Sequence, residues 1–323
     1  MNGRRRVTRV LALHDGRAGN ARQASALAQA LAPDDAGELV LQPSLAARWL
    51  APRTWPLLSG PFGPGFRATC EHPPSIAIGC GRQAALATRL LRHRGSQAVQ
   101  LLDPRIDSRH WDLVVAPQHD AMRGANVITM LGSLHPVDDL WLAQARHAAP
   151  LVAALPAPHT LLLVGGPTRH APLGDDGFVA LLRDLRARVH SEGGSFSAVA
   201  SRRTPARWRE ALIGSGTALP GLRWRDERDG PNPYAGLLAH ADRIVCTPDS
   251  VNMLSEAAAT LAPVFAWSPQ VAQGRLRLFM DDLLASGRVR ALDDMLAPFA
   301  VEPLRETARV AAEVGQRLGL DSG

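Results

Sequence analysis

The sequence predicts an α/β protein made of two Rossmann-like domains, each built on a parallel sheet. Short apolar runs alternate with stretches of helical periodicity along the whole chain, which is typical of strands joined by helical crossovers. Pro and Ala interrupt this alternation at 147–160, after which it restarts. The chain has 323 residues, enough for two domains of ordinary size. We therefore expect domains at 1–150 and 151–323, with their sheets facing across a cleft.

The expected elements follow from the apolar runs and from the polar or Gly-containing stretches between them. In the first domain we expect strands at 9–15, 38–42, 75–80, 98–103, 112–117 and 126–131, and helices near 20–32 and 82–94. In the second domain we expect strands at 160–166, 195–201, 243–246 and 263–267, and helices near 176–190, 205–213, 233–241 and 248–260. The amphipathic segment 301–320 predicts a last helix at about 302–319, expected to cross back and pack on the first domain.

Composition argues against several classes of protein. The formal net charge is +6, but the chain contains no lysine, and its arginines are scattered among Asp and Glu. Aromatic residues make up 5% of the chain, so stacking platforms for bases are scarce. We therefore expect no nucleic-acid partner. The three cysteines show no metal-binding spacing, so we expect neither zinc nor disulfides.

We also find neither a membrane-spanning segment nor a signal peptide in the apolar runs of the sequence. No apolar run reaches the roughly 18 residues that a membrane-spanning helix needs. The apolar run at 10–14 is too short for a signal peptide and leads into a turn at Asp15 and Gly16, which indicates a first strand. We expect a cytoplasmic protein.

The stretch 45–66 is irregular and unusually aromatic, with Trp49, Trp55, Phe62 and Phe66 among Pro and Gly. One interpretation is a loop whose aromatic side chains pack on the domain, and we favour it modestly. The other is an interfacial patch, because Trp beside Arg suits a lipid headgroup layer. The second interpretation predicts a peripheral location at the inner face of the membrane.

Two strand ends in the first domain carry groups suited to proton transfer. The first expected strand runs into Asp15, Gly16 and Gly19, and glycines at such a turn let a ligand approach the backbone. Another strand is followed by His119 and Asp120, and a His beside a carboxylate can act as a general base. Both pairs have an ordinary structural explanation, a tight turn and a solvated surface pair. We expect them at one edge of the same sheet.

Four strand-end loops in the second domain are polar. They contain Gly165, Gly166 and Thr168; Ser201, Arg202, Arg203 and Thr204; Asn232, Pro233 and Tyr234; and Thr247, Pro248, Asp249 and Ser250. Helix capping explains part of each loop, but the coincidence of all four indicates a ligand site. Arginine suits a diphosphate, whereas a carboxylate suits the hydroxyl groups of a ribose.

The last of these loops continues into the expected helix 248–260. Thr247 as N-cap and Pro248 as first helical residue would be ordinary capping. Asp249, Asn252 and Glu256 are spaced to share one face of that helix. Because Asp249 would repel a phosphate, we place phosphates near 201–204 and hydroxyl groups near Asp249, Asn252 and Glu256.

The chain resembles the bacterial relatives of the "elongated mitochondria" mitochondrial-fission family through motifs spread over about residues 13 to 265. These are "DGRAGN", "PQHD", "GGP", "SRRTP", "NPYAGLLAHAD" and "TPDSVNMLSEA". Members of that family are regarded as glycosyltransferases of the GT-B type, with two Rossmann domains. The helix that contains Glu256 is also similar to the donor-site helix of the lipid II-forming N-acetylglucosaminyltransferases, where a Glu holds the nucleotide ribose. Those families place Gly where this chain has Leu261, which predicts a longer helix here.

These observations lead to one main hypothesis, a metal-independent glycosyltransferase without a cofactor. It would move a sugar from a nucleotide diphosphate sugar to an acceptor such as a membrane glycolipid or cell-envelope glycan, reached through 45–66. The residues expected to act in proton transfer are His119, Asp15 and Asp120. The residues expected to bind the donor are Gly166, Thr168, Ser201, Arg202, Arg203, Thr204, Asn232, Tyr234, Asp249, Ser250, Asn252 and Glu256. The acceptor-side loop would consist of Gly16, Arg17, Gly19, Asn20 and Gln23.

Two other hypotheses remain open. A nucleotide-sugar epimerase would use the same fold, with acids and bases on both faces of the sugar. A non-catalytic scaffold would bind a membrane or partner protein through 45–66 and would not depend on Glu256.

Overall fold

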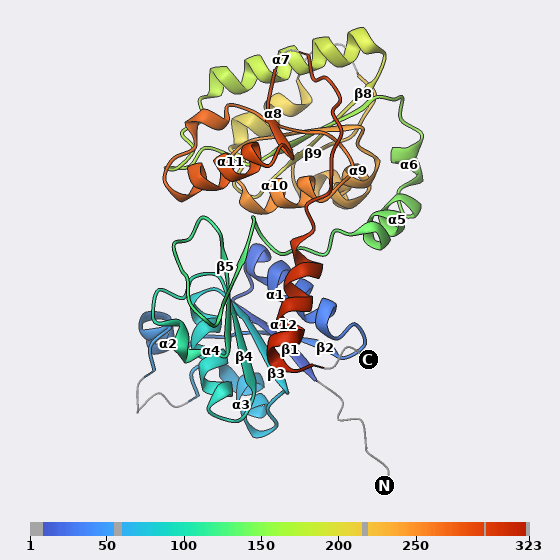
Figure 1. Cartoon of the computed structure of the whole chain (residues 1–323). Helices are drawn as coiled ribbons and strands as arrows, with labels where there is room; N and C mark the ends of the chain where they lie inside the picture. The colour runs from blue at the N-terminus through green and yellow to red at the C-terminus, as the bar shows by residue number, and fades with distance from the viewer. Residues whose placement is uncertain (1–8, 55–59, 215–218, 294, 321–323) are drawn as a thin grey trace. The chain divides into compact units, whose positions relative to one another are not determined.

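The computed structural model describes residues 9–54, 60–214, 219–293 and 295–320 (Figure 1). The chain divides into two compact units: Met1–Pro136 with Glu306–Gly323, and Val137–Arg305. Each unit contains a six-stranded parallel sheet with helices packed on both faces. The predicted α/β class with two parallel sheets is confirmed.

The sheet of the first unit has the strand order β2-β1-β3-β4-β5-β6. Its strands are β1 (Val10–His14), β2 (Ala36–Val40), β3 (Ile76–Cys80), β4 (Gln97–Leu101), β5 (Leu113–Pro117) and β6 (Val127–Met130). All but β2 are almost completely buried, which fits their unbroken apolar sequences. The order reverses between β1 and β3, and open α/β sheets bind ligands at such a switch point.

Helices cover both faces of this sheet. One face holds α1 (Ala18–Leu31) and α12 (Glu306–Leu318), and the other holds α4 (Arg82–Arg92) with α2 (Leu45–Leu50) and α3 (Gly63–Glu71). The two layers bury separate apolar clusters because successive side chains of a strand point to opposite faces.

The last helix, α12, belongs to the first unit although the second unit precedes it in the chain. Val310 and Val314 are fully buried beside α1. At its start, the Glu306 carboxylate accepts from the N–H of Leu131 at 2.9 Å, and Thr307 exchanges two hydrogen bonds with the main chain of His135. The helix therefore closes one face of the first sheet and fixes the end of β6.

The sheet of the second unit has the order β12-β11-β10-β7-β8-β9. Its strands are β7 (His159–Val164), β8 (Ser195–Ala200), β9 (Arg223–Trp224), β10 (Arg243–Cys246), β11 (Val264–Ala266) and β12 (Val289–Ala291). Counted within the unit, this is the 3-2-1-4-5-6 order of a Rossmann domain, and the switch point lies between β7 and β10.

One face of the second sheet packs against α7 (Asp175–Glu192) and α8 (Ala206–Ile213). Phe178 of α7 stacks on Trp208 of α8, with ring centroids 4.0 Å apart and planes 6° apart. The other face is covered by α9 (Tyr234–His240) and α10 (Val251–Ala258), which contact β7 and β10 respectively. α11 (Arg275–Ala285) precedes β12.

The passage between the units lies earlier than the expected boundary at 150. It falls at Pro136 and Val137, so α5 (Asp139–His147) and α6 (Pro150–Ala153) belong to the second unit. The reason is a helix–helix contact: α5 packs on α9, and Arg146 donates to the carbonyl of Ala239 at 2.8 Å. The stretch 147–160, rich in Pro and Ala, therefore contains the breaks between short helices within the second unit.

The expectation that 45–66 is irregular is wrong in part, since α2 and the start of α3 lie within it. Phe62 and Phe66 are buried in edge-to-face contact, with centroids 5.1 Å apart. Trp49 is 83% exposed. The buried Phe62 and Phe66 thus match the interpretation of a packed loop, and the exposed Trp49 matches that of an exposed patch. Trp55 lies outside the described residues.

We predict that α12 is required for the stability of the first unit. Val314→Ala removes two methyl groups from a fully buried position and should lower the free energy of unfolding by about 2 kcal/mol. Urea denaturation followed by circular dichroism measures the change. Gln316→Ala, on the exposed side of the same helix, should change it by less than about 0.5 kcal/mol. Equal effects of the two variants would contradict the prediction.

Candidate functional site

The switch point of the second sheet is occupied by a buried carboxylate. The Asp249 side chain, just after β10, has no exposed surface. Its Oδ1 accepts from the Thr247 hydroxyl at 2.7 Å, and that hydroxyl accepts from the N–H of Gly165 at 2.8 Å. Its Oδ2 accepts from Arg203 at 2.7 Å. Three loops, those after β7, β8 and β10, are therefore connected through one carboxylate.

The two glycines after β7 are required by this arrangement. A Cβ on Gly165 would lie 2.1 Å from both Asp249 carboxylate oxygens. A Cβ on Gly166 would lie 2.7 Å from the carbonyl oxygen of Arg203. Neither distance is compatible with a side chain. The Gly pair predicted as part of a ligand site thus lets three loops approach one another closely.

The loop after β8 is a turn closed by Thr204, which is buried. The Thr204 hydroxyl contacts the carbonyl oxygens of Val164 and Gly165 at 2.9 and 2.5 Å and accepts from the N–H of Ser201 at 2.9 Å. The Ser201 hydroxyl accepts from the N–H of Arg203 at 3.2 Å. Both hydroxyl groups, expected to bind phosphate, are therefore engaged in holding the turn.

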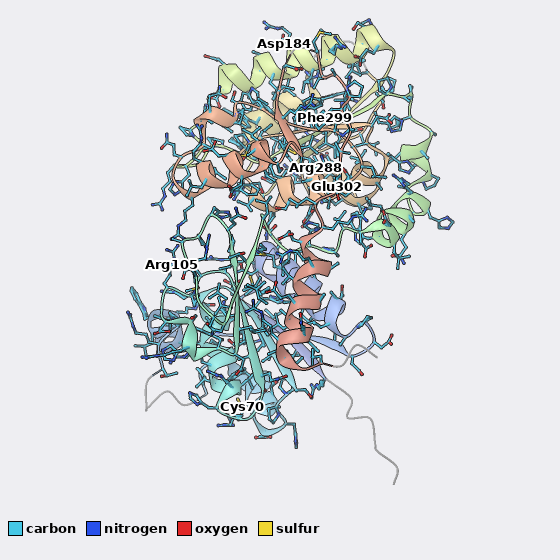
Figure 2. The ribbon with its side chains drawn as sticks, in the orientation of Figure 1. Cys70, Arg105, Asp184, Arg288, Phe299 and Glu302 are labelled. Atoms are coloured by element: carbon cyan, nitrogen blue, oxygen red, sulfur yellow. The ribbon has the colours of Figure 1, made fainter. Side chains whose placement is uncertain are left out.

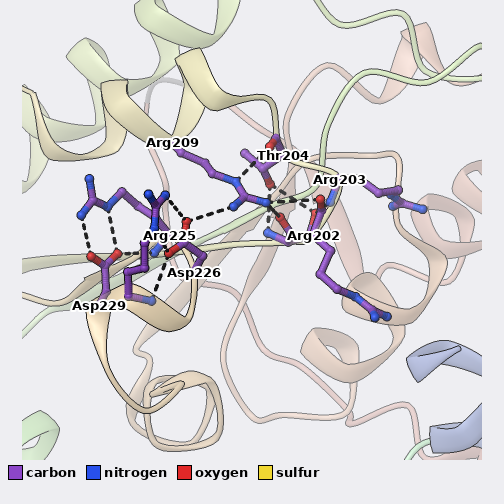
Figure 3. A network of polar contacts seen from close by, with 9 residues as sticks. Arg202, Arg203, Thr204, Arg209, Arg225, Asp226 and Asp229 are labelled. Atoms are coloured by element: carbon purple, nitrogen blue, oxygen red, sulfur yellow. Dashed lines mark hydrogen bonds and ion pairs between the residues drawn. The ribbon is translucent and has the colours of Figure 1, made fainter. Parts of the chain in front are cut away.

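Arg209 of α8 reaches back to the same turn (Figure 3). It donates to the carbonyl oxygens of Thr204, Ser201 and Arg202 at 3.0 to 3.2 Å. A further contact of 3.2 Å joins it to Asp226. Sequence reasoning missed Arg209, because no local pattern shows that the fourth residue of a helix returns to the preceding loop.

Two arginine–aspartate pairs extend this network, as Figure 3 shows. Hydrogen bonds from the Arg228 side chain lower the pKa of Asp226. Those from Arg225 lower the pKa of Asp229 to about 2. Both carboxylates are thus ionised at neutral pH.

Arg202 differs from the adjacent Arg203 in its contacts. It is exposed, and within the described residues its guanidinium makes no ion pair or hydrogen bond. It borders a cavity of about 310 Å³ together with Ser201 and Trp224. Of the two adjacent arginines, Arg203 neutralises Asp249 and Arg202 remains available to a ligand.

The helix after β10 begins later than expected. Its N-cap is Ser250, whose hydroxyl faces the N–H of Met253 at 3.5 Å, so the expected capping by Thr247 is wrong. The helix is α10 (Val251–Ala258) rather than 248–260. Asp249 therefore lies outside it, and only Asn252 and Glu256 share a helical face.

Glu256 is buried in α10, with 4% of its surface exposed. Its Oε2 accepts from the hydroxyl of Tyr234 at 2.5 Å. Tyr234 starts α9, where its N–H donates to the Asn232 side chain at 3.0 Å. The structure thus brings together three of the predicted donor residues, Asn232, Tyr234 and Glu256.

The end of α10 is held by Arg288, labelled in Figure 2, which is buried. Its guanidinium donates to the carbonyl oxygens of Ala257, Ala258, Thr260 and Ala262. Burial lowers the pKa of Arg288 to about 10. The helix therefore ends without a Gly C-cap, and the lengthening expected from Leu261 does not occur. No signal near Leu261 reveals a cap that lies 27 positions further along the chain.

In the first unit, Asp15 organises the turn after β1. Its Oδ1 accepts from the N–H of Arg17 at 3.2 Å and from the Asn20 side chain at 3.0 Å. Gly16 has a φ of +78°, and its N–H donates to His14 Nδ1 at 3.1 Å. His14 Nε2 therefore donates to Glu38 at 2.7 Å, and bonds from Ser25 and His14 lower the pKa of Glu38.

The remaining residues of the expected acceptor-side loop support the turn. Asn20 lies against Gly81, where a Cβ would approach its amide nitrogen to 2.6 Å. Gln23 is buried and donates to the carbonyl of Gly19 at 3.3 Å. Asn20 and Gln23 therefore take part in the packing of α1.

His119 and Asp120 follow β5, on the same edge of the sheet as Asp15. β3 and β4 separate β5 from β1, so the two strand ends are about 14 Å apart at the usual strand spacing. The structure thus places these predicted proton-transfer groups at one edge without bringing them into contact.

Thr168, the last predicted donor residue, closes a small turn. Its hydroxyl accepts from the N–H groups of His170 and Ala171 at 3.2 and 3.0 Å.

Within the described ranges, His, Cys, Asp and Glu form no group of three or more that could hold a metal ion. Cys80 and Cys246 are buried at strand ends, and burial raises the pKa of both thiols. No helix in the described part of the chain is both long and apolar enough to cross a membrane.

The two doubly wound sheets, with polar loops at the switch point of the second, define an α/β protein of the GT-B class. A candidate UDP-N-acetylglucosamine 2-epimerase from Listeria monocytogenes matches 98% of this chain and 97% of its own, with 12% identity and a TM-score of 0.56. The Methanocaldococcus jannaschii UDP-GlcNAc 2-epimerase, solved with UDP-GlcNAc and UDP, matches 95% and 99%, with 11% identity and a TM-score of 0.52. These similarities show the fold.

The chain belongs to the family described as Mitochondrial fission ELM1, whose model matches residues 18–318. It is 29% identical over 276 residues to the Mitochondrial fission protein ELM1 of Arabidopsis thaliana. The match covers 76% of this chain and 64% of that relative, so the chain spans less than two thirds of its length. The resemblance found in the sequence is confirmed.

We predict that Gly165 cannot carry a side chain. Gly165→Ala would force a Cβ into the Asp249 carboxylate and should lower the free energy of unfolding by about 2 kcal/mol or more. Urea denaturation measures this. Gly174→Ala is the control, since nothing lies within 4 Å of its Cβ position. Because Gly174 is the N-cap of α7, this change should cost at most about 1 kcal/mol. A neutral Gly165→Ala would refute the close approach.

We predict a pH-dependent contribution from the Arg225–Asp229 pair. The folded pKa of Asp229, about 2, lies below its ordinary value of 3.8. The pair therefore stabilises the fold fully above about pH 4 and loses this effect as the pH falls through about 2. Carboxyl NMR titration should show the Asp229 pKa rising toward 3.8 in Arg225→Gln. It should stay unchanged in Arg183→Gln, whose guanidinium pairs with Asp184 instead.

Proposed function

We propose that this protein is a glycosyltransferase that uses a nucleotide diphosphate sugar as donor. The acceptor would be a membrane glycolipid or cell-envelope glycan that meets the first unit near 45–66. The reaction would need no metal ion, because guanidinium and helix N–H groups can neutralise the leaving diphosphate.

The observation that carries this proposal is the polar cluster at the switch point of the second sheet. Ligands of open α/β sheets bind at this position, and here Asp249, Arg203 and Gly165 are held in one arrangement by short hydrogen bonds. Matched structures of the same fold include one solved with UDP-GlcNAc and UDP. A nucleotide sugar at this edge of the sheet is consistent with both observations.

The contacts suggest how the donor would be held. Arg202, exposed and without an ion pair in the described chain, would bind the diphosphate, since guanidinium forms bidentate bonds to phosphate oxygens. Arg203 would screen the phosphates from the charge of Asp249. Glu256, oriented by Tyr234, would accept hydroxyl groups of the ribose. Asn232, Ser250 and Asn252 would line the hydroxyl side of the site.

The acceptor hydroxyl would need a base. Asp15 is our first choice, because it borders a cavity of the first unit and is held by Asn20 and the N–H of Arg17. His119 with Asp120 is the second choice, after a strand three places away from β1 in the sheet.

A nucleotide-sugar epimerase is the second candidate, favoured by the epimerases among the matched structures. The two activities differ in their products. An epimerase converts a sugar nucleotide without an acceptor, whereas a transferase releases the nucleoside diphosphate only when an acceptor is present. Chromatography of the sugar nucleotide after incubation with the protein alone separates them.

We predict that one nucleotide stabilises this protein through Glu256. Thermal shift with UDP, GDP, ADP, CMP and dTDP should identify it, because a ligand at about 100 times its Kd adds about 2.7 kcal/mol. Glu256→Gln should abolish the shift. Asp176→Asn makes the same charge change at an exposed position of α7 and should retain it.

No shift with any nucleotide would count against both enzymatic candidates. It would instead favour a non-catalytic scaffold that binds a membrane or partner through 45–66.

A further inference from the structure

A cavity of about 850 Å³ lies in the first unit. It contains none of the residues of the polar cluster at the switch point of the second sheet. It is formed where β1, β2 and β3 end, by Asp15 and Arg17, by Gln42, and by Arg82 at the start of α4. The strand order reverses between β1 and β3. The cavity therefore occupies the position where the first sheet, taken alone, is expected to bind a ligand.

The charged side chains around this cavity are mostly cationic. Arg17, Arg48 and Arg82 border it, against the single carboxylate of Asp15. Arg17 contacts Asp15 at 3.5 Å. Within the described ranges neither Arg48 nor Arg82 has a carboxylate partner, whereas Arg92 and Arg105 of the same unit pair with Asp112 and Asp103. Arg82 donates to the carbonyl of Arg48 at 2.6 Å, which ties α2 to α4.

The main chain adds to the positive character of the cavity. Helices α1 and α4 begin beside it, and neither has a side-chain N-cap or an acidic residue in its first turn. Their first N–H groups thus donate to no N-cap side chain, and the one carboxylate near them is Asp15, just before α1. Three guanidinium groups and two such helix ends together favour an anion.

The rim of the cavity contributed by α2 is apolar. Leu45 and Trp49 border it and are 75% and 83% exposed. Large apolar side chains this exposed, beside arginines, suit a molecule with an apolar portion next to its charged group. A neutral glycan would match neither property, because its hydroxyl groups need acceptors and the cavity offers one carboxylate.

We infer that this cavity binds the phosphate or diphosphate group of an amphiphilic lipid, with the apolar chain lying against Leu45 and Trp49. The inference rests on the proposed function, for which it specifies the acceptor as a lipid phosphate or diphosphate. Arg48 and Arg82 hold the phosphate oxygens, and Asp15 stays at the edge of the site toward the acceptor hydroxyl.

Isothermal titration with two probes, inorganic pyrophosphate and geranyl diphosphate, tests this. Both should bind the wild-type protein, and geranyl diphosphate should bind more tightly. Arg48→Gln should weaken both about tenfold, the usual effect of losing a charge-assisted bond. Arg53→Gln changes the charge equally at an exposed residue outside the cavity and should leave both unchanged within twofold. Trp49→Ser should weaken geranyl diphosphate only.

Three results would overturn the inference. These are no binding of either probe, equal loss in Arg48→Gln and Arg53→Gln, or unaltered geranyl diphosphate binding in Trp49→Ser. The last would assign the site to a soluble phosphate compound instead of a lipid. The five nucleotides of the thermal-shift experiment, titrated into the same samples, keep the two proposals separate. Binding of one nucleotide without binding of either probe would refute this inference alone, whereas no binding by any of the five would refute the proposed donor site.

Discussion

The second unit depends on one buried charge, the carboxylate of Asp249. Removing a carboxylate from water costs several kcal/mol unless it is paired and hydrogen-bonded, and Asp249 is both, through Thr247 and Arg203. Those partners lie on different loops, so the cost is offset only when β7, β8 and β10 end in register. The absence of a side chain at Gly165 is part of the same constraint. The Asp249 carboxylate, whose burial costs free energy, thus fixes the geometry of the surrounding loops.

In this lysine-free chain, arginines hold main-chain carbonyl oxygens, a role that the net charge does not reveal. Arg209 holds the carbonyl oxygens of one loop and Arg288 those at the end of α10. Guanidinium suits this task because it presents five donors in a fixed plane. Many arginines of the described residues therefore bind main-chain carbonyl oxygens instead of carboxylates. Arg48 and Arg202, whose guanidinium groups make no such bond in the described chain, border cavities.

The sequence predicted the strands of both sheets well where they are apolar and buried, because hydrophobic runs between turn signals report burial directly. It missed β9 and β12, which have two and three residues and carry Arg223 and Arg290. It also missed α2, since Pro and Gly around it obscure the helical period. The polar loops of the site were found from their residue types. Their internal bonds were not, because Thr204 as a turn closure and Arg288 as a helix cap depend on contacts between distant segments.

The same topological rule gives the two units candidate sites of opposite charge. Each sheet reverses its strand order once, and each reversal opens a gap between the loops of two neighbouring strands. In the second unit a carboxylate lies in that gap, and Glu256 adds another nearby, which suits the hydroxyl groups of a sugar or ribose. In the first unit arginines and uncapped helix ends lie there, which suits phosphate. The topology therefore decides where each unit gathers its polar loops, and the few charged side chains at the reversal set the charge of each candidate site.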